Sequence, residues 1–261
     1  MQIFNAIGLE ILKEKTLNDL AENTKIRGEA SLSARSSGVV HGRCWRIGSG
    51  LEVWTILYES EAGEIFYADC RPGFRARFPQ NIRDWNLSEN ERGGTTTVEG
   101  KIEDCREKIF FQLQNLTEVG AKNFRRKILS VGLCGLAYNA KVSKQDENFA
   151  FAPLSRTPGN RSSNKTNWRL CGRVLNFNAL RNPFSGSDLY WIHLDLGDFN
   201  LEILVNQHAL KENELSLGAS VKADVWLQGH IITQSTFFSS YEGVDWSFNT
   251  IDFWNNFKKL N

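Results

Sequence analysis

Two stretches of the chain resemble each other, and their spacing restricts the folds that the chain can adopt. Residues 40–45 and residues 170–175 each place a Gly-Arg pair inside an otherwise apolar run. A second apolar segment with a glycine follows each pair after 57 or 58 residues: Gly100 follows Gly42, and Gly229 follows Gly172. This spacing predicts two similarly built, β-rich units in tandem.

The composition is that of a globular chain. Hydrophobic residues make up 41% of the 261 residues and aromatic residues 11%, which is enough to build cores and excludes a disordered chain. The 31 basic and 30 acidic residues leave a formal net charge of +1. A protein that coats duplex DNA normally has a basic excess, because neutralising phosphates supplies most of its non-specific affinity. The nearly neutral total therefore argues against a protein that is basic throughout, but it leaves room for a local basic patch.

Cysteine usage and the N-terminal residues predict a cytoplasmic protein. The five cysteines are odd in number, widely spaced and without a C-x-x-C pair, which favours separate buried thiols in a reducing compartment. No run of 18 apolar residues predicts a membrane span, and the N-terminus lacks the basic residues of a signal peptide. We therefore expect no membrane contact.

Residues 1–30 are expected to form an N-terminal amphipathic helix, because Ile3, Phe4, Ile7 and Ile11 recur at helical spacing. Residues 31–142 are expected to form the first β-rich unit. Alternating apolar residues at 51–58 and 64–69 predict a β-hairpin. Further strands are predicted at 95–102 and 108–113, and residues 128–142 predict a strand or a short buried segment.

Residues 143–167 predict a linker, because Gly, Pro, Ser and Asn dominate there and no periodicity persists. The second unit, residues 168–261, is predicted to begin with strands at 168–176, 189–196 and 201–205 and a long turn at 178–187. A short helix within 207–215 and a long strand at 220–232 follow. The tail, residues 241–261, is rich in Trp and Phe and is expected to dock, since so much aromatic area is costly to leave in water.

The order of elements in the second unit resembles an OB-fold, a small five-stranded β-barrel. Residues 168–235 carry the resemblance through three strands, a short helix and a long closing strand interrupted by Gly229, and residues 38–113 repeat it in weaker form. The predicted fold is therefore mainly β, with a few helices, two tandem OB-like units and an N-terminal helix. OB-like barrels often bind oligonucleotides or oligosaccharides, so the resemblance implies a binding function by analogy.

The strongest candidate for a functional site is an arginine-rich segment between Cys70 and Trp85. Guanidinium groups bind phosphates in a bidentate manner, and aromatic rings stack on bases. The candidate ligand-binding residues of this segment are Arg71, Phe74, Arg75, Arg77, Arg83 and Trp85. The same arginines could instead form internal salt bridges or contact an acidic protein. A smaller basic cluster, Lys122 and residues 125–127, is interpreted as a solvated face.

A second candidate lies in the second unit, where Tyr190 and Trp191 are adjacent in a predicted strand. Alternation places the two rings on opposite faces of the strand, so one of them could form part of a ligand-stacking platform. Core filling is the alternative, because tryptophans commonly fill the interior of a small barrel.

No residue pattern predicts a catalytic, cofactor or metal site. Residues 94–101 resemble a phosphate-binding loop, but five residues rather than four separate the glycines, and Ile102 replaces the hydroxyl that would bind magnesium. His41 and Cys44 form only one close pair, whereas zinc requires three or four ligands. The chain has no G-x-S-x-G elbow, although a catalytic group assembled from distant residues is not detectable in sequence.

These patterns predict a cytoplasmic binding protein without a cofactor. In the leading hypothesis, the arginine-rich segment contacts an anionic partner such as single-stranded nucleic acid. One alternative is a protein-interaction or scaffold role through a sheet edge or the aromatic tail, and another is an enzyme. The sequence makes no prediction of the oligomeric state.

Overall fold

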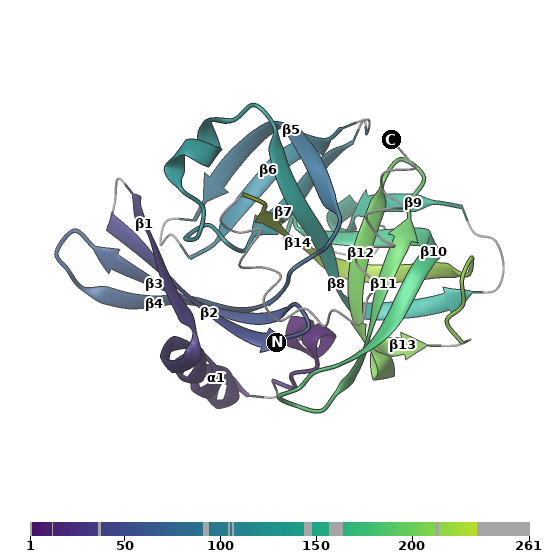
Figure 1. The fold of residues 1–261 in the computed structure, drawn as a ribbon, viewed down its shortest axis with the longest axis horizontal. Coiled ribbons are helices and arrows are strands. Elements are labelled where there is room, and N and C mark those ends of the chain that lie inside the picture. The colour runs from purple at the N-terminus through teal and green to yellow at the C-terminus, as the bar shows by residue number, and fades with distance from the viewer. Residues whose placement is uncertain are drawn as a thin grey trace.

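The computed structural model describes residues 2–11, 13–35, 38–90, 94–103, 105, 107–143, 148–156, 164–211 and 214–233. The fold is mainly β, as predicted, with its strands in two sheets (Figure 1). No helix in this part of the chain has the length and hydrophobicity needed to cross a membrane. All five cysteines are buried and free, as expected. The tail that we expected to dock lies outside the described residues.

A four-stranded antiparallel sheet forms one side of the molecule. Its strands follow each other in chain order: β1 (Glu29–Arg35), β2 (Gly38–Gly48), β3 (Leu51–Ser60) and β4 (Ile65–Phe74). The predicted hairpin at 51–58 and 64–69 is confirmed, because β3 and β4 pair along their length. Gly63 takes a φ of +79° in the connecting turn, a conformation that favours glycine.

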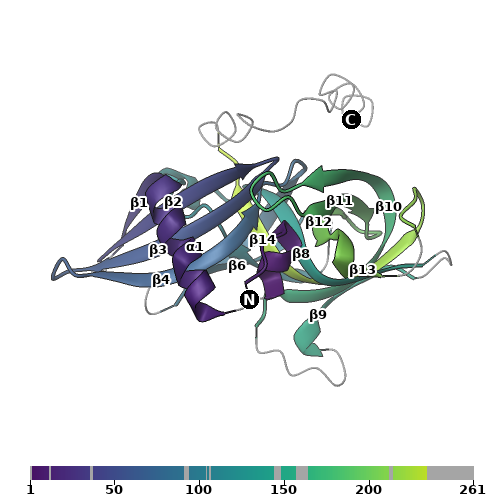
Figure 2. The same cartoon turned by 90° about the horizontal axis from the view of Figure 1, so that it is seen from below.

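Two helices precede this sheet, where one was expected. η1 (Gln2–Ile7) is a 3-10 helix and α1 (Glu14–Arg27) is an α-helix. Gly8 separates them with a φ of +77°, and a Cβ at this position would lie 2.7 Å from the Cβ of Ser187. α1 lies across one face of the four-stranded sheet (Figure 2), where the Thr55 hydroxyl donates to the carbonyl of Ala21 at 3.1 Å. The predicted stripe of Ile3, Phe4, Ile7 and Ile11 lies in η1 and in the connection that follows it, before α1 begins.

The second sheet contains ten strands. They are β5 (Pro79–Glu89), β6 (Thr96–Ile102), β7 (Lys108–Leu113), β8 (Leu129–Ser143), β9 (Ala150–Pro153), β10 (Asn167–Arg181), β11 (Asp188–Asp195), β12 (Asn200–Asn206), β13 (Leu210–Lys211) and β14 (Ser220–Ile231). Three short 3-10 helices connect them: η2 (Ala121–Arg125), η3 (Leu154–Arg156) and η4 (Gln207–Ala209).

Two predicted elements of this region differ in the structure. The turn expected at 178–187 is shorter, because β10 continues to Arg181 and pairs with β11 over that stretch. The helix expected within 207–215 is reduced to η4, and β13 follows it at once and pairs with β8. In both places pairing with a neighbouring strand overrides the local sequence preference.

The strand pairs of the ten-stranded sheet close two circuits that share β8 and β14. In the first circuit the order is β5, β6, β7, β14, β8 and back to β5. In the second circuit it is β10, β11, β12, β8, β14 and back to β10. The first circuit contains one parallel pair, β7 with β14, and the second contains one parallel pair, β12 with β8. All other pairs within the two circuits are antiparallel.

An internal repeat relates the two circuits. In the first circuit, Gln112 of β7 pairs with Gln228 of β14. In the second circuit, the parallel pair at the same place is Glu202 of β12 with Cys134 of β8. Cys134 and Gln228 pair with each other, so they form the centre of the repeat. β5 to β8 therefore correspond to β10, β11, β12 and β14, and each half contributes its fourth strand to the circuit of the other half.

The similarity noticed in the sequence does not coincide with this structural repeat. Gly42 lies in β2, outside both circuits, whereas Gly172 lies in β10. Gly100 lies in β6, and Gly229 lies in β14 one residue beyond the central pair. The position equivalent to Gly229 is Gly135 of β8. The glycines matched by spacing therefore occupy different strands of their repeats.

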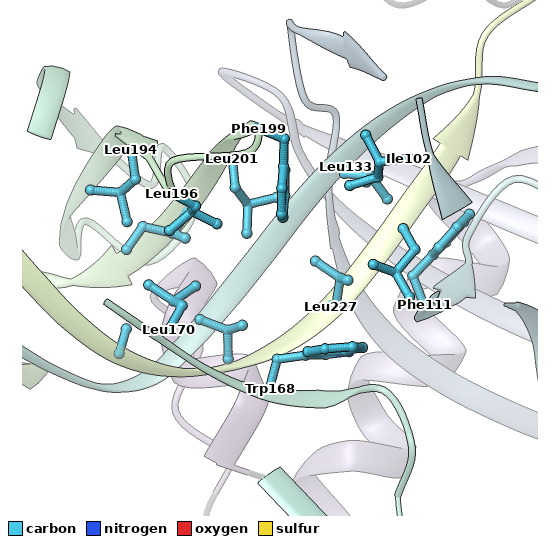
Figure 3. Packing of buried hydrophobic residues seen from close by; sticks show 14 of the residues in the cluster. Ile102, Phe111, Leu133, Trp168, Leu170, Leu194, Leu196, Phe199, Leu201 and Leu227 are labelled. Carbon is cyan, nitrogen blue, oxygen red and sulfur yellow. The ribbon is translucent and has the colours of Figure 1, made fainter. Parts of the chain in front are cut away.

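The predicted linker at 143–167 lies between two strands that pair. β8 ends at Ser143, the first residue of this stretch, and β14 follows it, yet the two strands pair from Val131 with Ile231 to Ser143 with Ser220. β9 and η3 lie within this stretch. Buried side chains of both circuits form one core cluster along the shared strands, as shown in Figure 3. Neither 31–142 nor 168–261 contains all the strands of a circuit.

Candidate anion-binding face

The structure separates the predicted arginine-rich site into a buried part and an exposed part. Arg71 and Arg75 are 5% and 7% exposed, and Phe74 is 1% exposed. These three side chains present very little surface to a ligand in solution. The interpretation of internal salt bridges therefore applies to the two arginines, and Phe74 belongs to the core.

Arg75 is the centre of a buried ionic network between the two sheets. Its Nε donates to Glu52, and its Nη2 donates to both carboxylate oxygens of Glu118 at 2.9 Å. His230 Nε2 lies 3.0 Å from Glu52 Oε2. Burial acts to raise the pKa of Glu52, but Arg75 and His230 outweigh it and hold that pKa well below its usual range. The network joins β3 and the residue that follows β4 to β14.

Arg71 is fixed in a similar way by groups in β4, before β6 and after β7. Its Nε donates to Gln114 Oε1 at 3.0 Å, and its Nη1 donates to the carbonyl of Gly94 at 2.7 Å and to Asp69 at 3.1 Å. Burial lowers the pKa of Arg71 from its ordinary value. The donors of Arg71 are used inside the fold, where they anchor the segments around Gly94 and Gln114.

The segment between β4 and β5 covers the predicted stacking platform. Trp191 is 2% exposed, and the guanidinium of half-buried Arg77 lies 5.3 Å above its ring. The Phe78 ring stacks on His193 with centroids 4.1 Å apart and an interplanar angle of 10°. Half-buried Tyr190 packs against the core cluster on the other side of the strand. Core filling, the alternative interpretation, therefore describes this pair of rings.

Glu202 holds this covering segment in place. Its carboxylate accepts the backbone N–H groups of Arg77 and Phe78, the latter at 2.7 Å, and the indole N–H of Trp191 at 2.6 Å. Burial raises the pKa of Glu202 to about 7 and lowers the pKa of His193 to about 4. Glu202 is only 1% exposed, and its hydrogen bonds hold the covering segment against Trp191.

Arg83 remains exposed and belongs to a line of cations that crosses three strands. It is directly opposite Lys101 of β6, and Lys101 is directly opposite Lys108 of β7. Ile82 and Ile102, their chain neighbours, are buried, so the cations lie on the outer face. We call Arg83, Lys101 and Lys108 the cation row. Like charges directly opposite each other destabilise a sheet, so the contacts between these cations do not stabilise the fold.

Carboxylates neutralise the cation row only in part. Lys101 Nζ lies 3.4 Å from Asp84, and Lys108 Nζ lies 2.6 Å from Glu99. Arg83 makes no ion pair with any residue in the described part of the chain. Phe110 is half-buried next to the row, and Lys165 Nζ lies 5.6 Å from the centre of its ring. Trp85, the last predicted residue, is half-buried and donates to the carbonyl of Arg126 at 3.1 Å.

The internal repeat shows that the architecture does not require these cations. The common register sets Thr97 opposite Gln112 in the first circuit and His193 opposite Glu202 in the second. The hairpin of β11 and β12 is shorter than that of β6 and β7, because its last pair is Asp195 with Asn200. The ladder has therefore ended before the positions that would correspond to Lys101 and Lys108, and Cys171 of β10 corresponds to Arg83. The second circuit therefore closes without a counterpart of the paired Lys101 and Lys108.

Sequence reasoning missed most of this face. It identified Arg83 but not Lys101, Lys108, Phe110 or Lys165, because these residues are scattered over more than eighty positions. The alternation in 96–102 and 108–113 was the available signal, since it places Lys101 and Lys108 opposite to the buried positions. The register between the strands was needed to bring them together.

Comparison with known proteins identifies no homologous site. No protein-family model matches the chain, and neither a curated protein nor a solved structure does. Within the described ranges, no group of three or more His, Cys, Asp or Glu side chains is arranged to hold a metal ion. The outer face of β5, β6 and β7 is the candidate site, on the basis of its charge and geometry.

Proposed function

We propose that the protein binds single-stranded nucleic acid on the outer face of β5, β6 and β7. The cation row carries this proposal. Neighbouring strands lie about 4.8 Å apart, so the row presents three positive charges within about 10 Å. Such a group attracts a phosphate backbone, and releasing the counterions of that backbone favours binding. The leading hypothesis from the sequence is thus kept, with Arg83 as the one predicted arginine that stays fully available.

An aromatic ring next to the cations suits a single strand better than a duplex. Phe110 is opposite Glu99 in the β6–β7 ladder, two residues along the strand from Lys108. Stacking of a base on such a ring contributes about 1–3 kcal/mol and needs an unpaired base. Lys165 above Phe110 adds a fourth cation beside this ring.

We further propose that each circuit is an OB-like barrel. Five strands in each circuit, a meander of three strands and a short helix before the fourth strand support this proposal. OB-folds bind oligonucleotides on the face of their second and third strands, which are β6 and β7 in the first circuit. In the second circuit, the covering segment with Phe78 occupies the corresponding face of β11 and β12.

Fluorescence anisotropy with a labelled 12-nucleotide oligo-dT at low salt tests the proposal. We expect a dissociation constant in the micromolar range or below, and a loss of at least tenfold in the variant Lys101→Ala with Lys108→Ala. The charge-matched control is Lys13→Ala with Lys25→Ala, two exposed lysines of the α1 region. Failure of the wild-type chain to bind DNA and the corresponding oligo-rU would refute the proposal. Equal competition by polyglutamate would favour an acidic protein as the partner.

Exposed apolar side chains favour a second candidate function, self-association through the four-stranded sheet. Leu32, Ile65 and Tyr67 are 63%, 61% and 50% exposed, and they lie on the sheet face that carries α1. Between them, His41 Nε2 and Glu59 Oε2 lie 2.7 Å apart. A face with a histidine ring beside a carboxylate is complementary to itself, because a two-fold axis can set Glu59 of one copy against His41 of another.

Light scattering over a concentration series tests this second candidate. We propose that the wild-type chain forms a dimer and that Ile65→Glu returns it to the monomer, because a carboxylate would be buried without a partner. Ile26→Glu, a change at an exposed residue on α1, is the matched control. A wild-type chain that stays monomeric at every concentration would rule out self-association and leave the nucleic-acid proposal unaffected.

A further inference from the structure

We infer that the basic segment around η2 is a second phosphate-binding site, which extends the bound strand beyond the cation row. The inference rests on the proposed function. We call this the η2 basic segment, and its four cations are Lys122, Arg125, Arg126 and Lys127. All four side chains are exposed. Over the ranges that the structure describes, none of them forms an ion pair with a carboxylate.

The backbone of the η2 basic segment is held by residues between the cations. Asn123 is 5% exposed, and its backbone N–H donates to the carbonyl of Gly120 at 2.9 Å. Phe124 packs against the core cluster. The Arg126 N–H donates to the carbonyl of Asn123 at 3.3 Å. A segment anchored in this way presents its cations outward without the entropy cost of ordering a free loop.

A hydrogen bond joins this segment to β5, the strand that contributes Arg83 to the cation row. The indole N–H of Trp85 donates to the carbonyl of Arg126 at 3.1 Å, and Trp85 follows Arg83 by two residues on β5. Asp84 between them has a φ of +50°, at a bulge in the pairing of β5 with β6. The η2 basic segment therefore lies beside β5, at the end of the cation row that carries Arg83.

The internal repeat again shows that this charge is not needed to build the fold. The connection that contains η4 is the equivalent one in the second circuit. Its residues 207–211 include two basic residues, His208 and Lys211, whereas the η2 basic segment has four. Both enrichments in positive charge fall on the same circuit and on adjacent elements. A shared ligand accounts for this coincidence.

The extended path has a consequence for ligand length. A strand that contacts only the cation row needs a few nucleotides, while one that also reaches the η2 basic segment needs more; OB-folds occlude roughly 4–16 nucleotides. The inference therefore predicts that affinity rises between a short and a long oligonucleotide, and that the η2 basic segment supplies the gain.

Anisotropy with labelled oligo-dT of 4 and of 12 nucleotides tests the inference. The variant is Arg125→Ala with Lys127→Ala, and Arg126 is kept because its carbonyl holds Trp85. We expect at least a fivefold loss of affinity for the 12-mer and less than a twofold change for the 4-mer. Lys101→Ala with Lys108→Ala should weaken both, and Lys13→Ala with Lys25→Ala should weaken neither.

The outcomes separate the inference from the function on which it rests. If the cation-row variant weakens binding while the η2 variant leaves the 12-mer unchanged, the inference is wrong and the proposed function stands. If the η2 variant weakens the 4-mer and the 12-mer equally, both clusters contact the same few nucleotides and the extended path is wrong. If the wild-type chain binds neither oligonucleotide, the proposed function itself fails.

Discussion

Gly135 of β8 and Gly229 of β14 occupy equivalent positions in the two repeats, each opposite a leucine of the other shared strand. Gly135 pairs with Leu227, and Gly229 pairs with Leu133. A Cβ on Gly229 would lie 2.6 Å from the ring of Phe111, whereas a Cβ on Gly135 would lie 3.0 Å from Val225. The missing side chains let the shared strands pass close to the packed residues of both circuits.

Gly229→Ala is therefore expected to destabilise the fold by about 1–3 kcal/mol, the usual range for overpacking a core. Phe111 is fully buried, so relieving the contact would require its ring to shift against a packed core. Gly135→Ala should cost less, because its closest contact is 0.4 Å longer. Free energies of unfolding from urea titrations will give the order, and a smaller loss for Gly229→Ala would contradict it.

Arg75→Ala is expected to destabilise the protein by about 3–5 kcal/mol, because it leaves Glu52 buried without its main partner. Arg83→Ala is the matched control and should change the free energy of unfolding by no more than about 0.5 kcal/mol. Chemical denaturation of both variants measures the difference. Similar small losses in both would show that the buried network contributes little.

Glu202→Gln is expected to change how stability depends on pH. Burial raises the pKa of Glu202 from 4.5 to about 7, so between these values the folded state holds a proton that the unfolded state has released. Wild-type stability from this group is present below pH 4.5 and is lost as the pH rises towards 7. Glutamine does not titrate, so the variant should gain up to about 3 kcal/mol relative to wild type between pH 5 and pH 8.

His193 titrates with the opposite sign and must be separated from this effect. Its pKa is lowered from 6.5 to about 4 by burial, so the unfolded state binds more protons between these values and stability rises with pH. Comparing Glu202→Gln with wild type at each pH removes the His193 contribution, which both proteins share. An unfolding free-energy difference that is the same at pH 5 and pH 8 would contradict the raised pKa.

The cation row should also determine how salt affects binding. Each phosphate contact on a single strand contributes roughly 0.7 to the slope of log K against log salt concentration. Lys101→Ala with Lys108→Ala should therefore reduce the magnitude of that slope by about 1.4. Titrations of oligo-dT between 50 and 200 mM salt would measure it. An unchanged slope would show that the two lysines do not contact phosphates.

Local features of the fold were predictable because they depend on neighbours in the sequence. Alternation of buried and exposed residues identified the hairpin of β3 and β4 and the long strand β14. The division of the N-terminal helix was not predictable in the same way, since Gly8 is constrained by its contact with Ser187, far along the chain. Local propensity is a weak guide wherever distant residues decide the packing.

The candidate site shows the same limit. The concentration of arginines between Cys70 and Trp85 was visible, but their roles differ with burial. Arg71 and Arg75 turn inward to Gln114 and Glu118, whereas Arg83 turns outward on β5. Neighbouring residues of a strand face opposite sides, and the elements that cover each side come from distant parts of the chain.

By itself, the sequence determined the β-rich class, most strand positions and the neutral total charge, because composition and period-two alternation act locally. Only the tertiary structure decided that β8 and β14 each serve two circuits, that Arg75 is buried and that Lys101 lies between Arg83 and Lys108. These features depend on the register between strands distant in the chain. Register is set by the burial of whole faces and by turn geometry, and a shift of one residue would exchange every buried and exposed side chain.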